Sequence, residues 1–472
     1  MSLSEPDLAA ATADELLTGF RSGSFTPVDA LDAVFGQLDR LEPQLNCFCL
    51  IDRDASYRSA RASAARWSQV KPQGLLDGVP VSVKDIVLTS GWPTLRGSRT
   101  VDADQAWHED GPAVARLREH GAVLFGKTTT PEFAFKGVTD SPLTGITRNP
   151  WNVELTPGGS SGGASASVAA GIGPLALATD AGGSIRIPAS FSGVFGHKPS
   201  GGRVAMYPPT PYASLAGFGP IARSVKDAAL MMSCIAAPDA RDWEAERTAP
   251  ARFDQLLDAD PRTWRIAWSP TLGFVDVQPE VRRIVEDAAM RFARMGATVE
   301  QVDWVMNDPW PILSRFKRGL TAYAFRNLPA SRHAEMDPAL VDEIMASQDS
   351  NLQDHLDAQS ERATLGRAMV AFHQTYDLLL TPTAAVLPFP VGRNAPQGYD
   401  GREWYGFTFP FNLTRQPAAS VPCGLSESGL PVGLQIVGPP GGDLAVLQAA
   451  HAFEHAYPWS KMAPMAGKDP TP

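Results

Sequence analysis

Residues 157–188 read PGGSSGGASASVAAGIGPLALATDAGGSIRIP, and this stretch constrains the fold more than any other part of the chain. Two glycine-rich turns, at 158–163 and 180–184, are joined by a run of small and apolar residues. Glycine and serine at this density suit either a flexible linker or bare backbone N–H groups that face an anion. The joining run predicts a short helix at 165–170 and a buried strand at 174–180, which would bring the two turns together.

Strand and helix patterns alternate along the rest of the chain. Strands are predicted at 77–90, 120–128, 376–383 and 430–438, and helices at 5–40, 113–120 and 444–455. Such alternation indicates an α/β fold built on one sheet. The polar stretch 236–262 either links two subdomains or crosses the surface, and residues 461–472 are expected to form a C-terminal tail.

Composition excludes several classes of protein. Charged residues are 19% of the 472 residues, below the usual ~25%, which suits one large buried core. The net charge is −10 and no run of Lys or Arg stands out, so no nucleic-acid partner is expected. No signal peptide and no transmembrane segment are predicted. The four cysteines form no Cys/His cluster, which indicates no metal site and a cytoplasmic setting.

Two short motifs match well-known patterns without their structural context. Residues 121–128, GAVLFGKT, fit the P-loop pattern, but the four middle residues are apolar and predict a buried strand ending at Gly126 instead of a phosphate loop. Residues 159–163 fit the nucleophile elbow with Ser161 at its centre, yet no apolar strand precedes them and no histidine stands in a triad context.

A lysine offers the base that the serines require. A serine hydroxyl is a weak nucleophile unless a base accepts its proton. Lys84 lies in an apolar strand pattern, VSVKD, where burial would favour the neutral amine that acts as a general base. The residue types alone leave a second interpretation open, in which Lys84 forms a structural salt bridge with Asp85.

The motifs together resemble the amidase signature family, the Ser-cisSer-Lys amidohydrolases. The core is GGSSGG at 158–163 followed by TDAGGSIRIP at 179–188, with GVPVSVKD at 78–85. Supporting segments include GKTTTPEF (126–133), TRNPWN (147–152), FNLTRQPAASVPCG (411–424) and GLPVGLQIVG (429–438). The resemblance covers residues 5–460, and it implies one amidase domain with a large mixed β-sheet covered by helices on both faces.

The resemblance also implies a catalytic set. Ser184 would be the nucleophile, Ser160 the bridging serine with a cis peptide bond, and Lys84 the base. Ser161 would help to hold Lys84 and Ser160 by hydrogen bonds, and no cofactor or metal would be required.

The turn before the nucleophile would form an oxyanion hole from its backbone N–H groups. By resemblance these are the amides of Ala181, Gly182, Gly183 and Ser184. Asp180 and Arg186 would fix the turn, and could do so by pairing with one another.

One departure from the family bears on the substrate. The transamidating member of the family, from the glutamine-dependent tRNA amidotransferase, has an aspartate shortly before its late F-T-x-P-x-N segment, where this chain has Tyr405. Tyr405 and Phe407 are therefore predicted to line an aromatic pocket that suits an apolar or aryl amide. The expected partner is a small-molecule amide, with possible homodimer formation and no membrane. An inactive scaffold and a tRNA amidotransferase subunit remain the alternatives.

Overall fold

The computed structural model describes residues 5–247, 251–399, 403–459 and 462–467. The helices of this part are α1 (Glu5–Ala10), α2 (Ala13–Ser22), α3 (Pro27–Leu45), α4 (Arg53–Ser68), α5 (Pro112–Glu119), α6 (Gly162–Ala169), α7 (Arg186–Ser192), α8 (Val225–Ile235), α9 (Pro279–Arg294), α10 (Trp310–Ala324), α11 (Pro338–Ser347), α12 (Leu352–Phe372), α13 (Pro410–Leu413) and α14 (Asp443–Ala456). Six short 3-10 helices are η1 (Glu132–Ala134), η2 (Phe253–Gln255), η3 (Pro261–Thr263), η4 (Ala330–Glu335), η5 (Glu403–Tyr405) and η6 (Pro464–Gly467).

Eleven strands form one mixed sheet in the order β1-β3-β2-β6-β8-β7-β12-β13-β11-β9-β10. They are β1 (Phe48–Ile51), β2 (Pro80–Lys84), β3 (Val123–Thr128), β6 (Leu175–Asp180), β7 (Phe195–Lys198), β8 (Gly217–Ala222), β9 (Arg265–Trp268), β10 (Thr298–Gln301), β11 (Leu378–Pro382), β12 (Ala418–Leu425) and β13 (Pro431–Val437). A separate ribbon pairs β4 (Asp140–Ser141) with β5 (Gly145–Ile146). The predicted mixed α/β fold is confirmed.

Alternating side chains of β6 show why both faces of the sheet are covered. Leu175 and Leu177 pack into a core that includes residues of α5, α8, α9 and α14. Ala176 and Ala178, which point the other way, pack with α6 and α7. Because both faces of the sheet are buried, the sequence of β6 is a nearly continuous apolar run instead of an alternating pattern.

The parallel strands β3, β2 and β6 place three chain turns at one edge. β2 pairs in parallel with β3 and with β6. Their carboxyl ends therefore meet, and Lys84, Thr128 and Asp180 are the last residues of the three strands. In open α/β sheets this edge is where ligands bind.

The predicted strand at 77–90 is wrong in its length. The structure ends β2 at Lys84, because the N–H groups of Ile86 and Val87 both donate to the Lys84 carbonyl, at 2.7 and 3.0 Å, and turn the chain. The apolar residues 86–88 that follow still suit a strand, so the sequence gave no sign of the turn. Thr26 caps α3 and Pro27 is its first residue.

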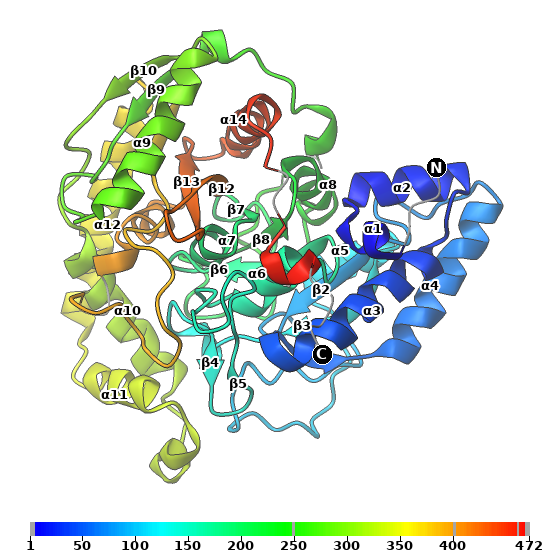
Figure 1. The fold of residues 1–472 in the computed structure, drawn as a ribbon. Helices are drawn as coiled ribbons and strands as arrows, with labels where there is room; N and C mark the ends of the chain where they lie inside the picture. Colours follow the sequence, from blue (N-terminus) through cyan, green and yellow to red (C-terminus); the bar gives the residue numbers. More distant parts are fainter. Residues whose placement is uncertain (1–4, 248–250, 400–402, 460–461, 468–472) are drawn as a thin grey trace.

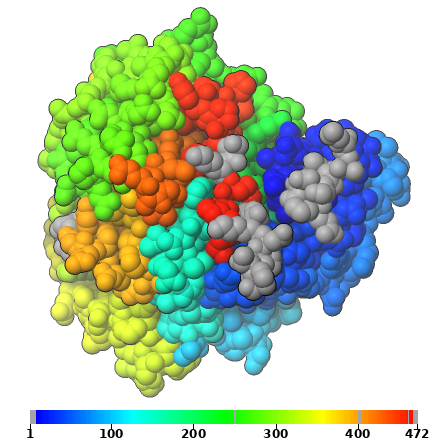
Figure 2. Space-filling model, viewed as in Figure 1, coloured from blue at the N-terminus to red at the C-terminus, as the bar shows by residue number. Residues whose placement is uncertain are grey.

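The C-terminal segment η6 lies beside the N-terminal helices (Figures 1 and 2). Arg40 of α3 donates to the Met465 carbonyl of η6 at 3.2 Å. The tail predicted at 461–472 falls partly outside the described residues. In the stretch 236–262, η2 packs against α8, where Ser233 Oγ donates to Asp254 at 2.7 Å.

Candidate active site

Lys84 lies at the centre of the site, at the carboxyl end of β2 and fully buried. Its Nζ is 2.7 Å from Ser160 Oγ, 2.9 Å from Ser161 Oγ and 2.9 Å from Thr179 Oγ1. Burial holds the pKa of the amine well below its usual value, and the more distant charge of Asp180 opposes this shift only partly. The neutral amine is therefore favoured, as a general base requires.

The structure also decides between the two interpretations of Lys84. Asp85 pairs with Lys127, 3.1 Å away, and not with Lys84. Lys127 lies on β3 with its amine also 3.2 Å from the Val87 carbonyl. The residue that fits the P-loop pattern is thus a buried structural lysine within a strand.

The first glycine-rich turn presents Ser160 to the lysine. The peptide bond between Gly159 and Ser160 is cis, as the resemblance implied. The turn is held from behind by Thr139, whose Oγ1 donates to the Gly158 carbonyl at 2.9 Å and accepts from the Gly162 amide at 3.0 Å. A Cβ on Gly159 would lie 2.6 Å from the backbone carbon of Val138, so only glycine fits there.

The second turn lies directly against the first. The Ser161 N–H donates to the Ser184 carbonyl at 3.1 Å, which places the half-buried Ser184 beside Ser160 and Ser161. Ser184 Oγ makes no hydrogen bond to any residue that the structure describes. The two turns that sequence separates by 24 residues are therefore brought together, with the Ser184 hydroxyl left unengaged.

The amides of this second turn differ in what they bind. The Gly183 N–H donates to Asp180 Oδ1 at 2.7 Å, so it is already engaged. The N–H groups of Ala181, Gly182 and Ser184 donate to no acceptor within the described residues. A Cβ at Gly182 would meet nothing within 4 Å, so space lies open at this position.

A buried Asp–Arg pair fixes the turn, as predicted. Arg186 Nε and Nη2 donate to the two Asp180 oxygens, each at 3.0 Å, and neither side chain is exposed. Burial alone would raise the pKa of Asp180, but Arg186, Lys198 and other partners outweigh it and hold this pKa well below its usual range. Asp180 is therefore a permanent anion that anchors the turn.

Sequence reasoning missed four residues that complete this network. Thr179 binds Lys84, Thr408 Oγ1 donates to the Gly182 carbonyl at 2.7 Å, and Asn412 and Gln435 accept from Arg186 at 2.7 and 2.8 Å. Thr179 precedes Asp180 in the same motif, and this position could have indicated that Thr179 belongs to the site. The other three come from more than 220 residues away in the chain. They lie in segments that carried the family resemblance, but local sequence did not indicate that they contact the turn.

The two predicted pocket residues occupy different environments. Phe407 is fully buried in the core, and its carbonyl accepts from Gln435 Nε2 at 2.9 Å. Tyr405 is half-buried and packs edge-to-face on Trp404, with ring centroids 5.2 Å apart. Its carbonyl accepts from Thr408 Oγ1 at 3.0 Å, which ties Tyr405 to the turn of Gly182.

Within the part of the chain that the structure describes, no histidine hydrogen-bonds to Lys84, Ser160 or Ser161. His197 is buried with Nε2 3.4 Å from Asp443, at the start of α14, and burial lowers the pKa of its ring although Asp443 opposes the shift. Among the residues described, no group of three or more His, Cys, Asp or Glu side chains could hold a metal ion.

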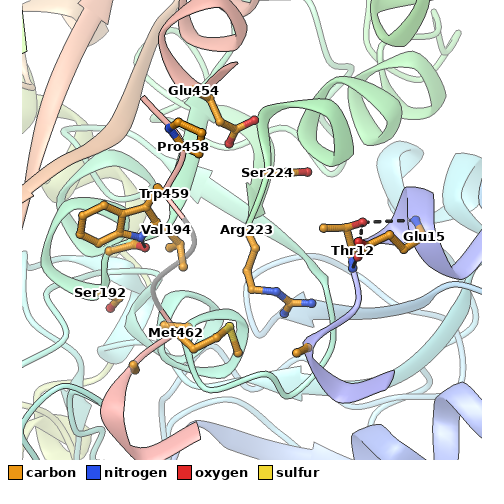
Figure 3. A pocket seen from close by; sticks show the side chains of 14 residues that line it. Thr12, Glu15, Ser192, Val194, Arg223, Ser224, Glu454, Pro458, Trp459 and Met462 are labelled. Atoms are coloured by element: carbon orange, nitrogen blue, oxygen red, sulfur yellow. Dashed lines mark hydrogen bonds between the residues drawn. The ribbon is translucent and has the colours of Figure 1, made fainter. Parts of the chain in front are cut away.

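A cavity of about 380 Å³ lies elsewhere in the molecule (Figure 3). Its lining includes Ala169, Ser192, Arg223, Glu454 and Trp459. Ala169 and Ser192 are the last residues of α6 and α7, whose first residues adjoin the two glycine turns. The cavity is therefore at the far ends of these helices from Lys84.

A buried amine joined to serine hydroxyls, beside a turn of open amides, is typical of hydrolases in which lysine replaces histidine as the base. A model of the Amidase family matches residues 29–447. The acylamidase of Rhodococcus erythropolis is 33% identical over 98% of both chains. A glutamyl-tRNA(Gln) amidotransferase subunit from Geotalea daltonii is 32% identical over 96% of this chain and 99% of its own.

A solved structure supports the same assignment. A bacterial aryl acylamidase of the amidase signature family superimposes with a TM-score of 0.90, at 32% identity, over 98% of this chain and 99% of that one. The chain belongs to the amidase signature family, and it is an amidase. Within the described residues, no helix is both long enough and apolar enough to span a membrane.

Proposed function

We propose that this amidase cleaves the C–N bond of a carboxamide through an acyl-enzyme on Ser184, with Ser160 as proton bridge and Lys84 as base. The observation that carries the proposal is the buried contact of 2.7 Å between Lys84 Nζ and Ser160 Oγ. No acidic side chain pairs with this amine among the described residues, so no contacting ion pair opposes the neutral form that burial favours.

The hydrogen bonds suggest a direction for proton transfer. Ser161 Oγ donates to the Thr179 carbonyl at 3.0 Å, so toward Lys84 it is an acceptor. A neutral amine has two N–H donors and one lone pair for its three hydroxyl partners. If Thr179 accepts the second N–H, the lone pair faces Ser160, whose oxygen is then free to accept the Ser184 proton.

The reaction follows from this arrangement. Lys84 takes the proton of Ser160 while Ser160 takes that of Ser184, and Ser184 Oγ attacks the carbonyl carbon. The amides of Ala181, Gly182 and Ser184 stabilise the oxyanion, a contribution of ~10²–10³ in rate for each donor in other hydrolases. The leaving amine receives a proton through Ser160 as the C–N bond breaks, and water then hydrolyses the ester.

The substrate class that we propose is an apolar or aryl amide, with side activity on esters. Two relatives act as an acylamidase and an aryl acylamidase by name. The aromatic segment that carries Tyr405 adjoins the oxyanion turn through Thr408, which supports the same class. A neutral aryl group would be held there by ring packing, without a charged partner.

An amidotransferase subunit is the second candidate, because the Geotalea daltonii protein is nearly as similar as the acylamidase. The two functions differ in what the protein requires. An amidase hydrolyses its amide alone, whereas an amidotransferase subunit transfers ammonia from glutamine to a tRNA-bound amino acid and depends on other subunits.

We further propose that residues 5–460 form one domain, since strands from both halves of the chain complete a single sheet. We also propose a cytoplasmic protein that acts on a small molecule and can form a homodimer. The net charge of −10 supports the absence of a nucleic-acid partner.

The experiment that tests the proposal is active-site labelling. The purified protein is treated with a fluorophosphonate, and the modified peptide is identified by mass spectrometry, alongside assays with acetanilide and with glutamine. Adduct on Ser184 that is lost in Lys84→Ala, with acetanilide hydrolysed by the protein alone, supports the amidase. Adduct on Ser161, or no adduct and no hydrolysis, refutes the mechanism.

A further inference from the structure

The loop that follows β2 lies at the same sheet edge as the proposed catalytic residues. It leaves the sheet after Lys84, and Gly97 returns to that edge, where its N–H donates to Asp85 Oδ2 at 3.2 Å. The neighbouring Arg96 carbonyl accepts from the Phe133 amide at 2.8 Å. Because the chain continues from Phe133 to Val138, which packs behind Gly159, this loop and the serine turn share one neighbour.

The backbone at this contact is held in an unusual conformation. Arg96 has a φ of 57°, and its partners across the contact, Phe133 and Ala134, have φ of 49° and 58°. Residues other than glycine rarely adopt such angles, and where they do they gather at binding and catalytic sites. Only glycine fits at position 97, since a Cβ there would lie 2.6 Å from the Thr130 carbonyl oxygen.

The side chain of Arg96 is half-buried, yet its guanidinium makes no hydrogen bond and no ion pair with any residue that the structure describes. Asp85, the acid whose charge acts on Arg96, is already engaged by Lys127 at 3.1 Å. Burial lowers the pKa of Arg96, and Asp85 opposes the shift at longer range. A partly desolvated cation without a partner is costly unless something binds it.

We propose that Arg96 binds a carboxylate on the substrate and is thereby a specificity residue for amides that carry a negative charge away from the scissile bond. This inference rests on the proposed amidase function. A guanidinium presents two parallel N–H groups that match a carboxylate. Phe133, whose amide donates to the Arg96 carbonyl, pairs edge-to-face with Phe325, with centroids 5.1 Å apart, and such rings suit an aryl or alkyl body between the charge and the amide.

The test compares charged and neutral substrates of similar shape. On the amine side the pair is 4-acetamidobenzoate and 4-methylacetanilide; on the acyl side it is succinanilate and valeranilide. Arg96→Gln should raise KM for the charged member of one pair about 10- to 100-fold, the range for a lost charge-assisted hydrogen bond. The KM of the neutral members and kcat should change less than about twofold, and Arg96→Lys should lie between.

Arg99→Gln is the matched control, because Arg99 is an exposed arginine three residues further along the same loop. It should leave every KM within about twofold. Three results would overturn the inference: equal changes in KM for charged and neutral substrates, an equal effect in Arg99→Gln, or no preference of the wild type for the charged substrates. Hydrolysis of the anilides would still uphold the proposed function in each case. Failure of the wild type to cleave any of the four amides, without Ser184 labelling, would overturn both.

Discussion

Replacing each of the two buried lysines by methionine should separate catalysis from stability. Lys84 and Lys127 lie on adjacent strands and both are fully buried. Lys84 contacts hydroxyl groups only, whereas Lys127 pairs with Asp85. We expect Lys84→Met to lose activity and keep its stability, and Lys127→Met to lose stability.

The magnitudes follow from these contacts. A general base contributes ~10²–10⁴ in rate, so Lys84→Met should raise the activation free energy by ~3–5 kcal/mol. Two opposing contributions determine how Lys84→Met changes the free energy of unfolding. The three hydrogen bonds are worth ~0.5–1.5 kcal/mol each, but burial of the amine has a cost of its own.

The sign of that cost follows from the lowered pKa of Lys84. Between the folded value and the unfolded value of 10.5, the unfolded chain binds a proton that the folded protein does not. The free energy of unfolding therefore falls by ~1.4 kcal/mol per unit as the pH decreases through this window. Methionine removes this penalty, so the net change in stability should be close to zero at neutral pH.

Lys127→Met leaves the Asp85 carboxyl buried without its cation, at a cost of ~3–5 kcal/mol. For 472 residues at ~2.1 cal/mol/K each, the unfolding entropy is about 1 kcal/mol/K, so Tm should fall by ~3–5 °C. Differential scanning calorimetry and anilide hydrolysis measure the two effects. Equal destabilisation by both variants, or an active Lys84→Met, would refute the reasoning.

Three further outcomes are expected. Gly159→Ala should lower both Tm and activity, because its Cβ would lie 2.6 Å from Val138. Gly182→Ala should keep the wild-type Tm, since nothing lies within 4 Å of its Cβ. Calorimetry measures both values, and equal Tm values for the two variants would contradict this. Arg186→Met should lower Tm by ~3–5 °C by leaving its buried carboxylate partner unpaired, and an unchanged melting curve would show the pair to be dispensable. The kcat/KM profile should rise with pH through an apparent pKa below 10.5, as Lys84 loses its proton; a flat profile would exclude Lys84 as the base.

Local sequence predicted the parts of the site that depend on residue type and neighbours along the chain. The apolar run ending at Asp180 predicted β6, and the glycines on either side of Ser160 and Ser184 predicted close-approach turns. An apolar strand pattern around Lys84 was sufficient to predict its burial, because a side chain inside such a strand has little access to water.

Other parts were beyond local reasoning. The length of β2 depended on a turn at Lys84, which the apolar residues 86–88 after it did not reveal. Whether Asp85 pairs with Lys84 or Lys127 could not be read from the chain, because both choices place an acid near a lysine. Successive side chains on a strand point to opposite faces, and only the sheet order showed which lysine shares a face with Asp85.

The sequence by itself determined the chemistry available: a buried lysine, two serines within glycine turns, and an Asp–Arg pair within one motif. Tertiary structure alone decided how these groups are engaged. Asn412 and Gln435 bind Arg186 across more than 220 residues, and the Gly183 amide is taken up by Asp180 while its neighbours remain open. The physical reason is that residue type sets what a group can donate or accept, whereas its partners are chosen by packing between segments that are distant in the chain.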